Sequence, residues 1–437
     1  MQYWNQGMET MSENDMRQLQ LIRFKKIMLH AYEHSNAYRE LYDAYHITPE
    51  DIHTFDDISN VPVTDKKFIA ENLNDGEDDK TLAIDPSDIY FYHQTSGTTA
   101  KFIPQPDSRF DWLFHSECCA KSLWSFGIRK EDRVLVAFNY NLFIGFWECH
   151  YACERIGCEI VPAGGLSTEA RLEKIRELNV TVIMTTPSYA LKIAETAEKL
   201  GIDLKNSSVK ILVTSGEPGG LQGNIKERLM QSWGADVYDL VGATEVGAWG
   251  FECPSHCGCI HVDESDFIPE ILEFDSDCPI TEPGKKGRLV LTSLFRSARP
   301  CIRFNTNDIA CWSEKKCSCG RTYRMLEGGV QGRIDHIMKV KGTFVNPASI
   351  ADIILKHPKC SGEYKIIIHE DNTHITVKIE VKQGIRLEEY KMITDDISKK
   401  IQNTMYLKMS VLLVPYGSIE KSEYKANRIV DLRKEKD

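Results

Sequence analysis

The sequence predicts an α/β protein in which a large domain with mainly parallel sheets carries a small α+β cap. Two observations indicate this fold class. Short β-branched runs alternate with helical segments over residues 133–241, and such alternation is typical of parallel sheets that helices cover on both faces. After residue 334 the pattern changes to a unit of about 100 residues, which is a usual domain size. We therefore expect a domain at residues 1–334 and a cap at residues 335–437.

Apolar residues at helical spacing over residues 15–45 predict a helical N-terminal segment. In the alternating region, runs of Val, Ile and Thr predict strands, and longer amphipathic segments predict helices. The expected strands are 134–138, 160–162, 180–184, 209–213 and 237–241, and the expected helices are 143–156, 169–178, 188–200 and 223–233. Alternating residues in the cap predict strands at 364–369, 375–381 and 411–414 and a helix at 387–405.

Composition and charge narrow the classes of partner. The chain has 437 residues, of which 42% are hydrophobic, and a formal net charge of -11. Nucleic-acid binding needs a clustered cationic surface, so we expect no nucleic-acid partner. No run approaches the roughly 18 apolar residues of a membrane helix, and the first residues lack a secretory pattern, so we expect a cytoplasmic protein without membrane contact. Its 14 cysteines are then expected as thiols or metal ligands.

Three loops are candidate site loops, and the first has residue types that suit a polyphosphate. Residues 93–101, His-Gln-Thr-Ser-Gly-Thr-Thr-Ala-Lys, follow an extended run. Gly97 lets the backbone approach an anion, hydroxyl and N–H groups surround its oxygens, and Lys101 adds a positive charge. The other two loops are 214–220 and 242–247, each after a predicted strand. Because ligands of parallel sheets bind at the carboxyl ends of strands, these loops form a candidate site.

Six motifs in this order resemble the AMP-forming adenylating superfamily, and within it the phenylacetate–CoA ligase-like branch, over nearly the whole chain. They are a phosphate loop at 95–101, an adenine-side loop at 216–218, a Gly-x-Thr-Glu motif at 242–245, a ribose-binding segment at 303–308, a hinge at 332–335 and a catalytic-lysine segment at 422–428.

The resemblance implies an enzyme that uses ATP, Mg²⁺ and CoA. In it, Lys425, Glu245 and Thr244 are the catalytic residues. Attack of a carboxylate on the α-phosphorus builds charge on phosphoryl oxygens, where cations and fixed dipoles are needed. Glu245 would ligate Mg²⁺, and Asp308 would accept both ribose hydroxyls. The residues assigned to ATP or AMP are Thr95, Ser96, Gly97, Thr98, Thr99, Lys101, Ser215, Gly216, Glu217, Pro218, Gly242, Ala243, Asp308 and Arg333.

In the family the cap rotates between acyl-adenylate formation and thiol attack. Asp335 stands at the hinge, so the resemblance implies that one cleft presents Lys425 first and the face near Lys341 and Gly342 second. The chain departs from the family motifs at four positions. Ala100 replaces a glycine, Phe102 a proline and Asn307 a glycine, although Asn tolerates a left-handed backbone, and Val241 stands where an aromatic residue is frequent.

Cysteines and histidines gather at residues 253–261 and 317–320. Thiolate and imidazole ligands suit a closed tetrahedral Zn²⁺ site, although the spacing is not that of a standard finger. His256, Cys257 and Cys259 are further candidate ligands, and Cys257 or Cys259 could take the place of His261. An iron–sulfur cluster is an alternative to zinc. Some members of the branch carry zinc, and the resemblance selects a structural site made of Cys253, His261, Cys317 and Cys319.

The family's acyl pocket corresponds here to Tyr140, Phe143, Trp147 and Val241. An aromatic lining favours an aryl or arylacetic acid. Alternatively, Phe146 and Trp147 form the buried face of an amphipathic helix. A separate alternative is that His150 and Glu154, one helical turn apart, bind a polar substituent such as an amino or hydroxyl group.

We therefore expect an AMP-forming ligase that joins an aryl or arylacetic acid to CoA. Two alternatives remain: an adenylating enzyme that loads a carrier protein or transfers AMP to another acceptor, and a non-catalytic nucleotide-binding scaffold. A homodimer is implied by resemblance only.

Overall fold

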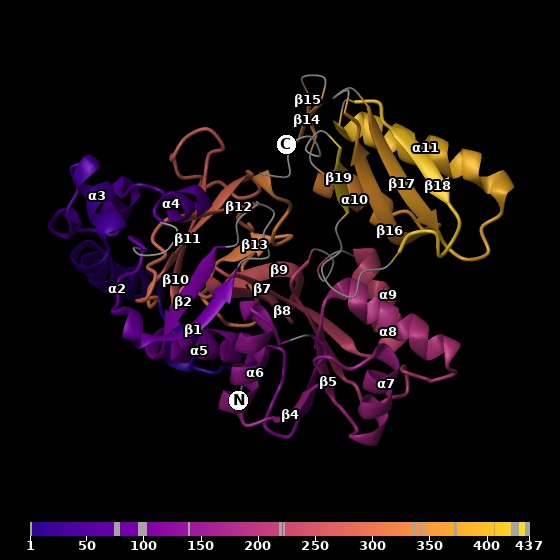
Figure 1. The fold of residues 1–437 in the computed structure, drawn as a ribbon, viewed down its shortest axis with the longest axis horizontal. Coiled ribbons are helices and arrows are strands. Elements are labelled where there is room, and N and C mark those ends of the chain that lie inside the picture. The colour runs from indigo at the N-terminus through magenta and orange to yellow at the C-terminus, as the bar shows by residue number, and fades with distance from the viewer. Residues whose placement is uncertain are drawn as a thin grey trace.

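The computed structural model describes residues 2–73, 79–94, 103–138, 140–217, 221, 223–334, 338–340, 343–345, 347–370, 374–405, 407–420 and 428–432. These residues form a large N-terminal part and a smaller C-terminal part with its own sheet (Figure 1). The expected α/β class is confirmed. The domain boundary at 334/335 stays a prediction, because residues 335–337 lie outside the described residues.

The main sheet has eight strands within the described residues, in the order β13-β9-β8-β7-β6-β5-β3-β4. Neighbours from β4 to β7 are parallel, as the alternation predicts, whereas β8, β9 and β13 extend the sheet in antiparallel fashion. The sheet is therefore mixed. Its strands are β3 (Arg133–Val136), β4 (Glu159–Pro162), β5 (Val182–Thr185), β6 (Ile211–Thr214), β7 (Asp236–Ala243), β8 (Gly247–Cys253), β9 (His256–Val262) and β13 (Met325–Glu327).

Helices cover both faces of this sheet (Figure 1). Alternate strand residues point to opposite faces: Val134 and Val182 pack with α5 and α6, whereas Leu135 and Ile183 pack with α7, α8 and α9. The helices are α5 (Arg109–Ser125), α6 (Ile144–Ile156), α7 (Thr168–Glu177), α8 (Pro187–Lys199) and α9 (Gly223–Trp233). Because β3, β4, β5, β6 and β7 are parallel, their carboxyl ends point to the same end of the sheet.

An N-terminal helical layer packs against a second sheet of β10, β11 and β12 (Figure 1). Phe24 and Met28 share a core with Ile268 and Ile302. The predicted helical segment is broken at Ser35, whose hydroxyl accepts from the first turn of the next helix and so caps it. The elements are α1 (Gln6–Glu9), α2 (Glu13–His34), α3 (Asn36–Ala44), α4 (Lys66–Glu71), β10 (Phe267–Leu272), β11 (Gly287–Ser293) and β12 (Phe304–Ala310).

The C-terminal part has the expected α+β composition, with its sheet in the order β18-β17-β16-β19. It lies beside α8 and α9, and Arg228 of α9 donates a hydrogen bond to the carbonyl of Ser361 (Figure 1). Its elements are α10 (Pro347–Leu355), β16 (Cys360–Ile368), β17 (Ile375–Val381), α11 (Leu387–Met405), β18 (Ser410–Val414) and β19 (Ile429–Asp431). Two hairpins complete the fold: β1 (Ile89–Gln94) with β2 (Pro104–Ser108), and β14 (Met338–Val340) with β15 (Thr343–Val345).

None of the described helices is long and apolar enough to cross a membrane.

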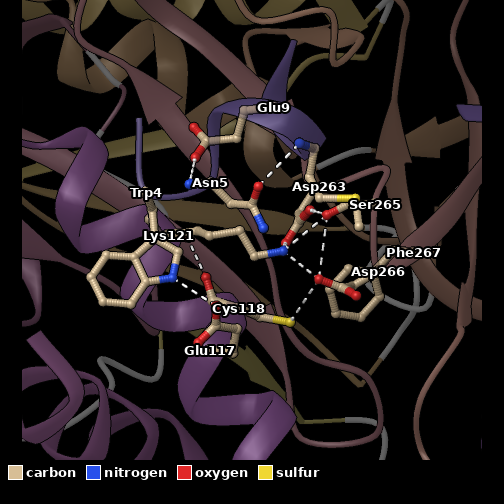
Figure 2. Close-up of polar contacts among 12 residues, drawn as sticks. Trp4, Asn5, Glu9, Glu117, Cys118, Lys121, Asp263, Ser265, Asp266 and Phe267 are labelled. Atoms are coloured by element: carbon tan, nitrogen blue, oxygen red, sulfur yellow. Dashed lines mark hydrogen bonds and ion pairs between the residues drawn. The ribbon is translucent and has the colours of Figure 1, made fainter. Parts of the chain in front are cut away.

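A buried lysine of α5 joins this helix to the turn between β9 and β10 (Figure 2). Lys121 Nζ lies 2.6 Å from a carboxylate oxygen of Asp263 and 2.9 Å from Ser265 Oγ, and it also pairs with Asp266. Arg23 of α2 reaches Asp266 at 2.7 Å. Burial alone would lower the pKa of Lys121, but the two carboxylates outweigh it and hold the pKa well above its usual value. The lysine is therefore charged, and it balances two buried carboxylates.

We expect Lys121→Met to lower the free energy of unfolding by about 3–5 kcal/mol, because it leaves two buried carboxylates with one cation. Urea unfolding at neutral pH measures this change. The control is Lys130→Met, which removes an exposed lysine 3.9 Å from Glu131 and should have little effect. Equal destabilisation by the two substitutions would contradict the ion cluster's importance.

Candidate active site

The carboxyl ends of β5 and β6 lie side by side, and β7 continues four residues beyond them, from Asp239 to Ala243. Thr185 pairs with Thr214, and Thr214 pairs with Asp239 of β7. The Ser215 amide donates to the Thr185 carbonyl at 3.2 Å, so the loop after β6 starts at this edge. The two loops predicted as site loops, which begin near Ser215 and Gly242, therefore lie at the same end of the parallel strands.

Glu217 is held at the N-terminus of α8. One of its carboxylate oxygens accepts a 2.7 Å hydrogen bond from the amide of Ser188, a position where the helix dipole favours negative charge. Gly216, immediately before it, has a φ of 89°. A left-handed backbone of this kind suits glycine, which allows the turn that brings Glu217 to the helix.

Glu245 lies just beyond the end of β7 and is 5% exposed. Its carboxylate lies 3.0 Å from Nζ of Lys66, the first residue of α4. The segment before α4 is fixed on β12: the Thr64 amide donates to the Arg303 carbonyl at 3.0 Å, and the Asn305 amide donates to the Thr64 carbonyl at 2.7 Å. A carboxylate in this position is an oxygen ligand of the kind that Mg²⁺ prefers.

Asp308 and Arg333 form a second polar pair. They stand opposite each other in an antiparallel bridge, and the Arg333 guanidinium lies 3.1 Å from a carboxylate oxygen of Asp308. Asn307, which precedes Asp308 in β12, has a φ of 62°. It thus takes the left-handed conformation that its replacement of glycine requires.

Several predicted site residues lie outside the described residues. They are Thr95, Ser96, Gly97, Thr98, Thr99, Ala100, Lys101, Phe102, Pro218, Asp335, Lys341, Gly342 and Lys425.

Aromatic rings cluster where the acyl pocket is expected. The Tyr140 hydroxyl lies 3.1 Å from Nδ1 of His150, and the Tyr140 ring packs edge-on against Trp147 at 4.8 Å. Trp147 donates its indole N–H to the carbonyl of Asn141 at 2.8 Å. Phe143 precedes α6 and is half-buried, as is Val241 in β7.

Behind the Glu245 turn lies a buried charge network that sequence reasoning missed. Asp107 of β2 accepts from Arg296 at 2.8 Å and lies 3.3 Å from Nε2 of His115. Nδ1 of His115 lies 2.9 Å from the carboxylate of Glu148, and Nδ1 of His93 lies 3.3 Å from the second oxygen of Asp107. The five residues are at most 2% exposed. Two carboxylates thus face a guanidinium and two imidazoles in the buried interior.

The charges in this network determine its protonation. Burial alone would raise the pKa of Asp107, but Arg296 and His115 outweigh it and hold that pKa well below the usual range. Burial would lower the pKa of His115, yet Asp107 and Glu148 raise it to about 9. At neutral pH the network therefore contains an ionised Asp107 and an imidazolium.

The network connects to the Thr-Glu motif. Arg296 donates to the carbonyl of Thr244 at 2.9 Å and to the carbonyl of Glu245. Gly247 has a φ of 103°, and a Cβ there would lie 2.5 Å from Nδ1 of His115. The turn that presents Glu245 therefore requires glycine at this position and packs directly on the imidazolium.

Asp239 is a second carboxyl with a strongly shifted pKa. Burial raises its pKa to about 8, and Glu252 contributes in the same direction, whereas the hydrogen bond from Thr214 at 2.9 Å opposes it. Asp239 is therefore mostly protonated at neutral pH, at the edge where the site loops begin.

The structure brings Cys253, His261, Cys317 and Cys319 together. Their candidate ligand atoms all lie within 4.8 Å of one another. Nδ1 of His261 is 2.9 Å from the Tyr323 carbonyl, which leaves Nε2 facing Cys319 at 3.4 Å. Cys259 lies apart from this group, with Sγ 3.3 Å from the carboxylate of Glu327.

Two family profiles match the chain. The profile of the AMP-binding enzyme family matches residues 45–290, more than half of the chain, and that of the AMP-binding enzyme C-terminal domain matches residues 342–433. The chain belongs to the AMP-binding enzyme family.

Curated relatives point to one branch of this family. Phenylacetate-coenzyme A ligase of Escherichia coli (strain K12) is 30% identical to this AMP-binding enzyme over 437 residues, 97% of each chain. The ligase of Pseudomonas putida is 29% identical over 98% of this chain and 96% of its own. The resemblance to the phenylacetate–CoA ligase-like branch is confirmed, and it supports an AMP-forming acid–CoA ligase.

A solved relative adds information about the cap. 2-Hydroxyisobutyryl-CoA ligase in the postadenylation state superposes with a TM-score of 0.92, at 25% identity, over 99% of this chain and 93% of its own. The same ligase in the thioesterification state is 26% identical and superposes with a TM-score of 0.75, over 99% of this chain and 92% of its own. The described residues of this AMP-binding enzyme therefore have an arrangement closer to that of the relative's postadenylation state.

The buried network gives a pH dependence of stability. The folded-state pKa of His115, about 9, lies above its usual value of 6.5. Its contribution to the free energy of unfolding is therefore fully present below pH 6.5 and is lost as the pH rises through 9, a change of about 3 kcal/mol. We expect the stability difference between the wild type and His115→Gln to shrink from pH 6 to pH 10 in urea unfolding.

The control for this measurement is His34→Gln, which replaces an exposed histidine that faces Glu33 at 3.9 Å. The free energy of unfolding of His34→Gln should stay close to that of the wild type at every pH. If the wild type and His115→Gln lost stability in parallel with pH, His115 would not be an imidazolium in the native state.

Proposed function

We propose that this enzyme uses ATP to activate an aryl or arylacetic acid as an acyl-adenylate and then transfers the acyl group to CoA. The proposal rests above all on Glu245, a buried carboxylate paired with Lys66 just beyond the end of β7. The near-complete overlap with phenylacetate-coenzyme A ligases supports the choice of acid and acceptor.

In the first half-reaction an oxygen of the acid forms a bond to the α-phosphorus, and the bond to pyrophosphate breaks. Glu245 would hold Mg²⁺, which when bound neutralises charge on phosphate oxygens. The Thr244 hydroxyl would donate to the α-phosphate, and Asp308, oriented by Arg333 at 3.1 Å, would accept the ribose hydroxyls. Lys425 would bring its charge to the reacting carboxylate.

In the second half-reaction the sulfur of CoA forms a bond to the acyl carbon, AMP leaves, and the thiol proton passes to solvent. We propose that the cap turns about Asp335 between the two halves, so that the face near Lys341 and Gly342 replaces the Lys425 segment. A shared cleft keeps the acyl-adenylate away from water until the thiol arrives.

The aromatic rings near α6 support an aryl substrate. Tyr140 and Trp147 pack edge-on at 4.8 Å, and Trp147 lies 6.2 Å from Phe91 of β1. Flat apolar surfaces of this kind bind a flat ring. Because His150 already faces the Tyr140 hydroxyl, we favour an apolar ring contact at this end of the pocket.

We expect pyrophosphate release from ATP and Mg²⁺ to depend on an aryl or arylacetic acid and to be stimulated by CoA. Lys425→Ala should lower the rate about 100-fold or more, because it removes a charge that acts mainly in the transition state. Lys421→Ala, four residues earlier, is the control. Release that is indifferent to CoA would indicate a carrier protein or another acceptor, and ATP binding without release would indicate a non-catalytic scaffold.

We also propose that Cys253, His261, Cys317 and Cys319 hold a structural Zn²⁺. Three thiolates and one imidazole provide a complete tetrahedral set from the protein, as structural sites require. Backbone N–H groups lie 3.4 Å from two of the sulfurs, Cys319 N from Cys317 and Arg321 N from Cys319. Such donors stabilise thiolates.

Elemental analysis of the purified protein should find about one zinc per chain. Cys319→Ser should remove most of the metal and lower the melting temperature. The control Cys259→Ser changes a buried cysteine of β9 whose Sγ faces Glu327, and this variant should keep the metal. Full zinc content in Cys319→Ser, or iron in place of zinc, would refute this assignment.

A further inference from the structure

Three buried polar nitrogens, on neighbouring side chains of β1, β2 and α5, have no hydrogen-bond partner among the described residues. They are Nε2 of His93, Nε2 of Gln105 and Nε1 of Trp112. The side chains are 2%, 1% and 3% exposed. Buried polar groups are almost always paired, because leaving one unpaired is unfavourable. Three such groups in one place indicate that a polar ligand belongs there.

The three side chains come from three elements that meet at one corner of the large domain. His93 of β1 stands directly opposite Gln105 of β2 in the antiparallel pair, which places both side chains on the same face. The ring of Trp112, from α5, stacks on that of His93 at 5.0 Å with an interplanar angle of 21°. We call this group the His93 corner.

Neighbouring charges determine what the corner offers. Asp107 is ionised, because Arg296 and His115 hold its pKa low, and an ionised carboxylate can only accept. The 3.3 Å contact of Asp107 with Nδ1 of His93 therefore places a hydrogen on Nδ1. In the neutral ring Nε2 is then an acceptor, whereas the Trp112 and Gln105 nitrogens are donors. The corner offers two donors and one acceptor.

We propose that the His93 corner binds a hydroxyl group of the acid substrate, so that the preferred substrate is a hydroxylated aryl or arylacetic acid. A hydroxyl accepts two hydrogen bonds and donates one, which matches the corner. A carbonyl or carboxylate would leave the His93 acceptor unpaired, and an ammonium would face two donors. This inference rests on the proposed function and names its substrate class.

The position of the corner connects it to both parts of the expected site. Trp112 packs edge-on against Tyr151 of α6 at 5.3 Å, and Phe91 lies between the corner and Trp147, 4.6 Å from Trp112 and 6.2 Å from Trp147. On its other side, Asp107 reaches the Thr-Glu turn through Arg296. A substrate ring among these aromatic residues would thus have a hydroxyl-binding group beside it.

An ordered water offers the same chemistry as a hydroxyl, so the experiment must separate the two. The probes are the three hydroxyphenylacetates and mandelate, each compared with phenylacetate and with the analogue that carries methyl in place of hydroxyl. The readout is kcat/KM for pyrophosphate release. At least one hydroxylated acid should exceed its methyl analogue about 100-fold, since a site built for a hydroxyl leaves its own groups unpaired with the analogue.

Trp112→Phe removes the indole N–H but keeps a stacked ring, and it should reduce this preference about tenfold. The matched control is Trp124→Phe, in the same helix, whose indole N–H also finds no partner in the described part of the chain but which packs on Trp4, away from the corner. It should keep the preference. Gln105→Met is a second variant that removes a donor at similar volume.

Equal kcat/KM for hydroxylated and methylated acids in the wild type would mean that water fills the corner, and it would overturn the inference while leaving the ligase intact. Equal effects of Trp112→Phe and Trp124→Phe would also overturn it. If the wild type released no pyrophosphate with any acid, the proposed function itself would fail, and the inference with it.

Discussion

Charge neutrality in the buried interior beside Glu245 determines the geometry of the active site. Asp107 and Glu148 are balanced there by Arg296 and His115. Removing one partner of such a group costs more than the pair contributes, because the remaining charge has lost both water and compensation. The four side chains therefore hold β2, α5, α6 and the segment around residue 296 in one arrangement. Arg296 extends this constraint to the turn that presents Glu245.

Periodicity and motif order in the sequence predicted most of the architecture. Alternating strands and helices predicted the parallel part of the main sheet, because each β-branched run must be covered on both faces. The cap followed from a change to two-residue alternation. Loops at strand ends predicted where Ser215 and Glu245 lie, since parallel strands align their carboxyl ends. The sequence also predicted that Asn307 could replace glycine, and its φ of 62° agrees.

Buried charges could not be predicted in this way. Asp107, His115 and Glu148 look like surface residues, because charged side chains are seldom buried without partners and the partners are distant in sequence. Helix α5 was missed since it is buried on most sides and has no clear apolar stripe, although the capping box of Ser108 and Asp111 marked its start. The sequence did not indicate Lys66 as a site residue, because its pairing with Glu245 depends on how α4 packs on β12.

The N-terminal helical layer has consequences for the order of synthesis. Gln20 donates to the carbonyl of Glu264, 244 residues later, and Tyr3 donates to the carbonyl of Cys319, 316 residues later. At ribosomal rates of about 5–20 residues per second, the first helices wait about 10 to 60 s for the residues that cover them. Throughout that time Phe24 and Met28 lack their native partners Ile268 and Ile302. The first helices therefore keep an uncovered apolar face until the last third of the large domain has left the ribosome.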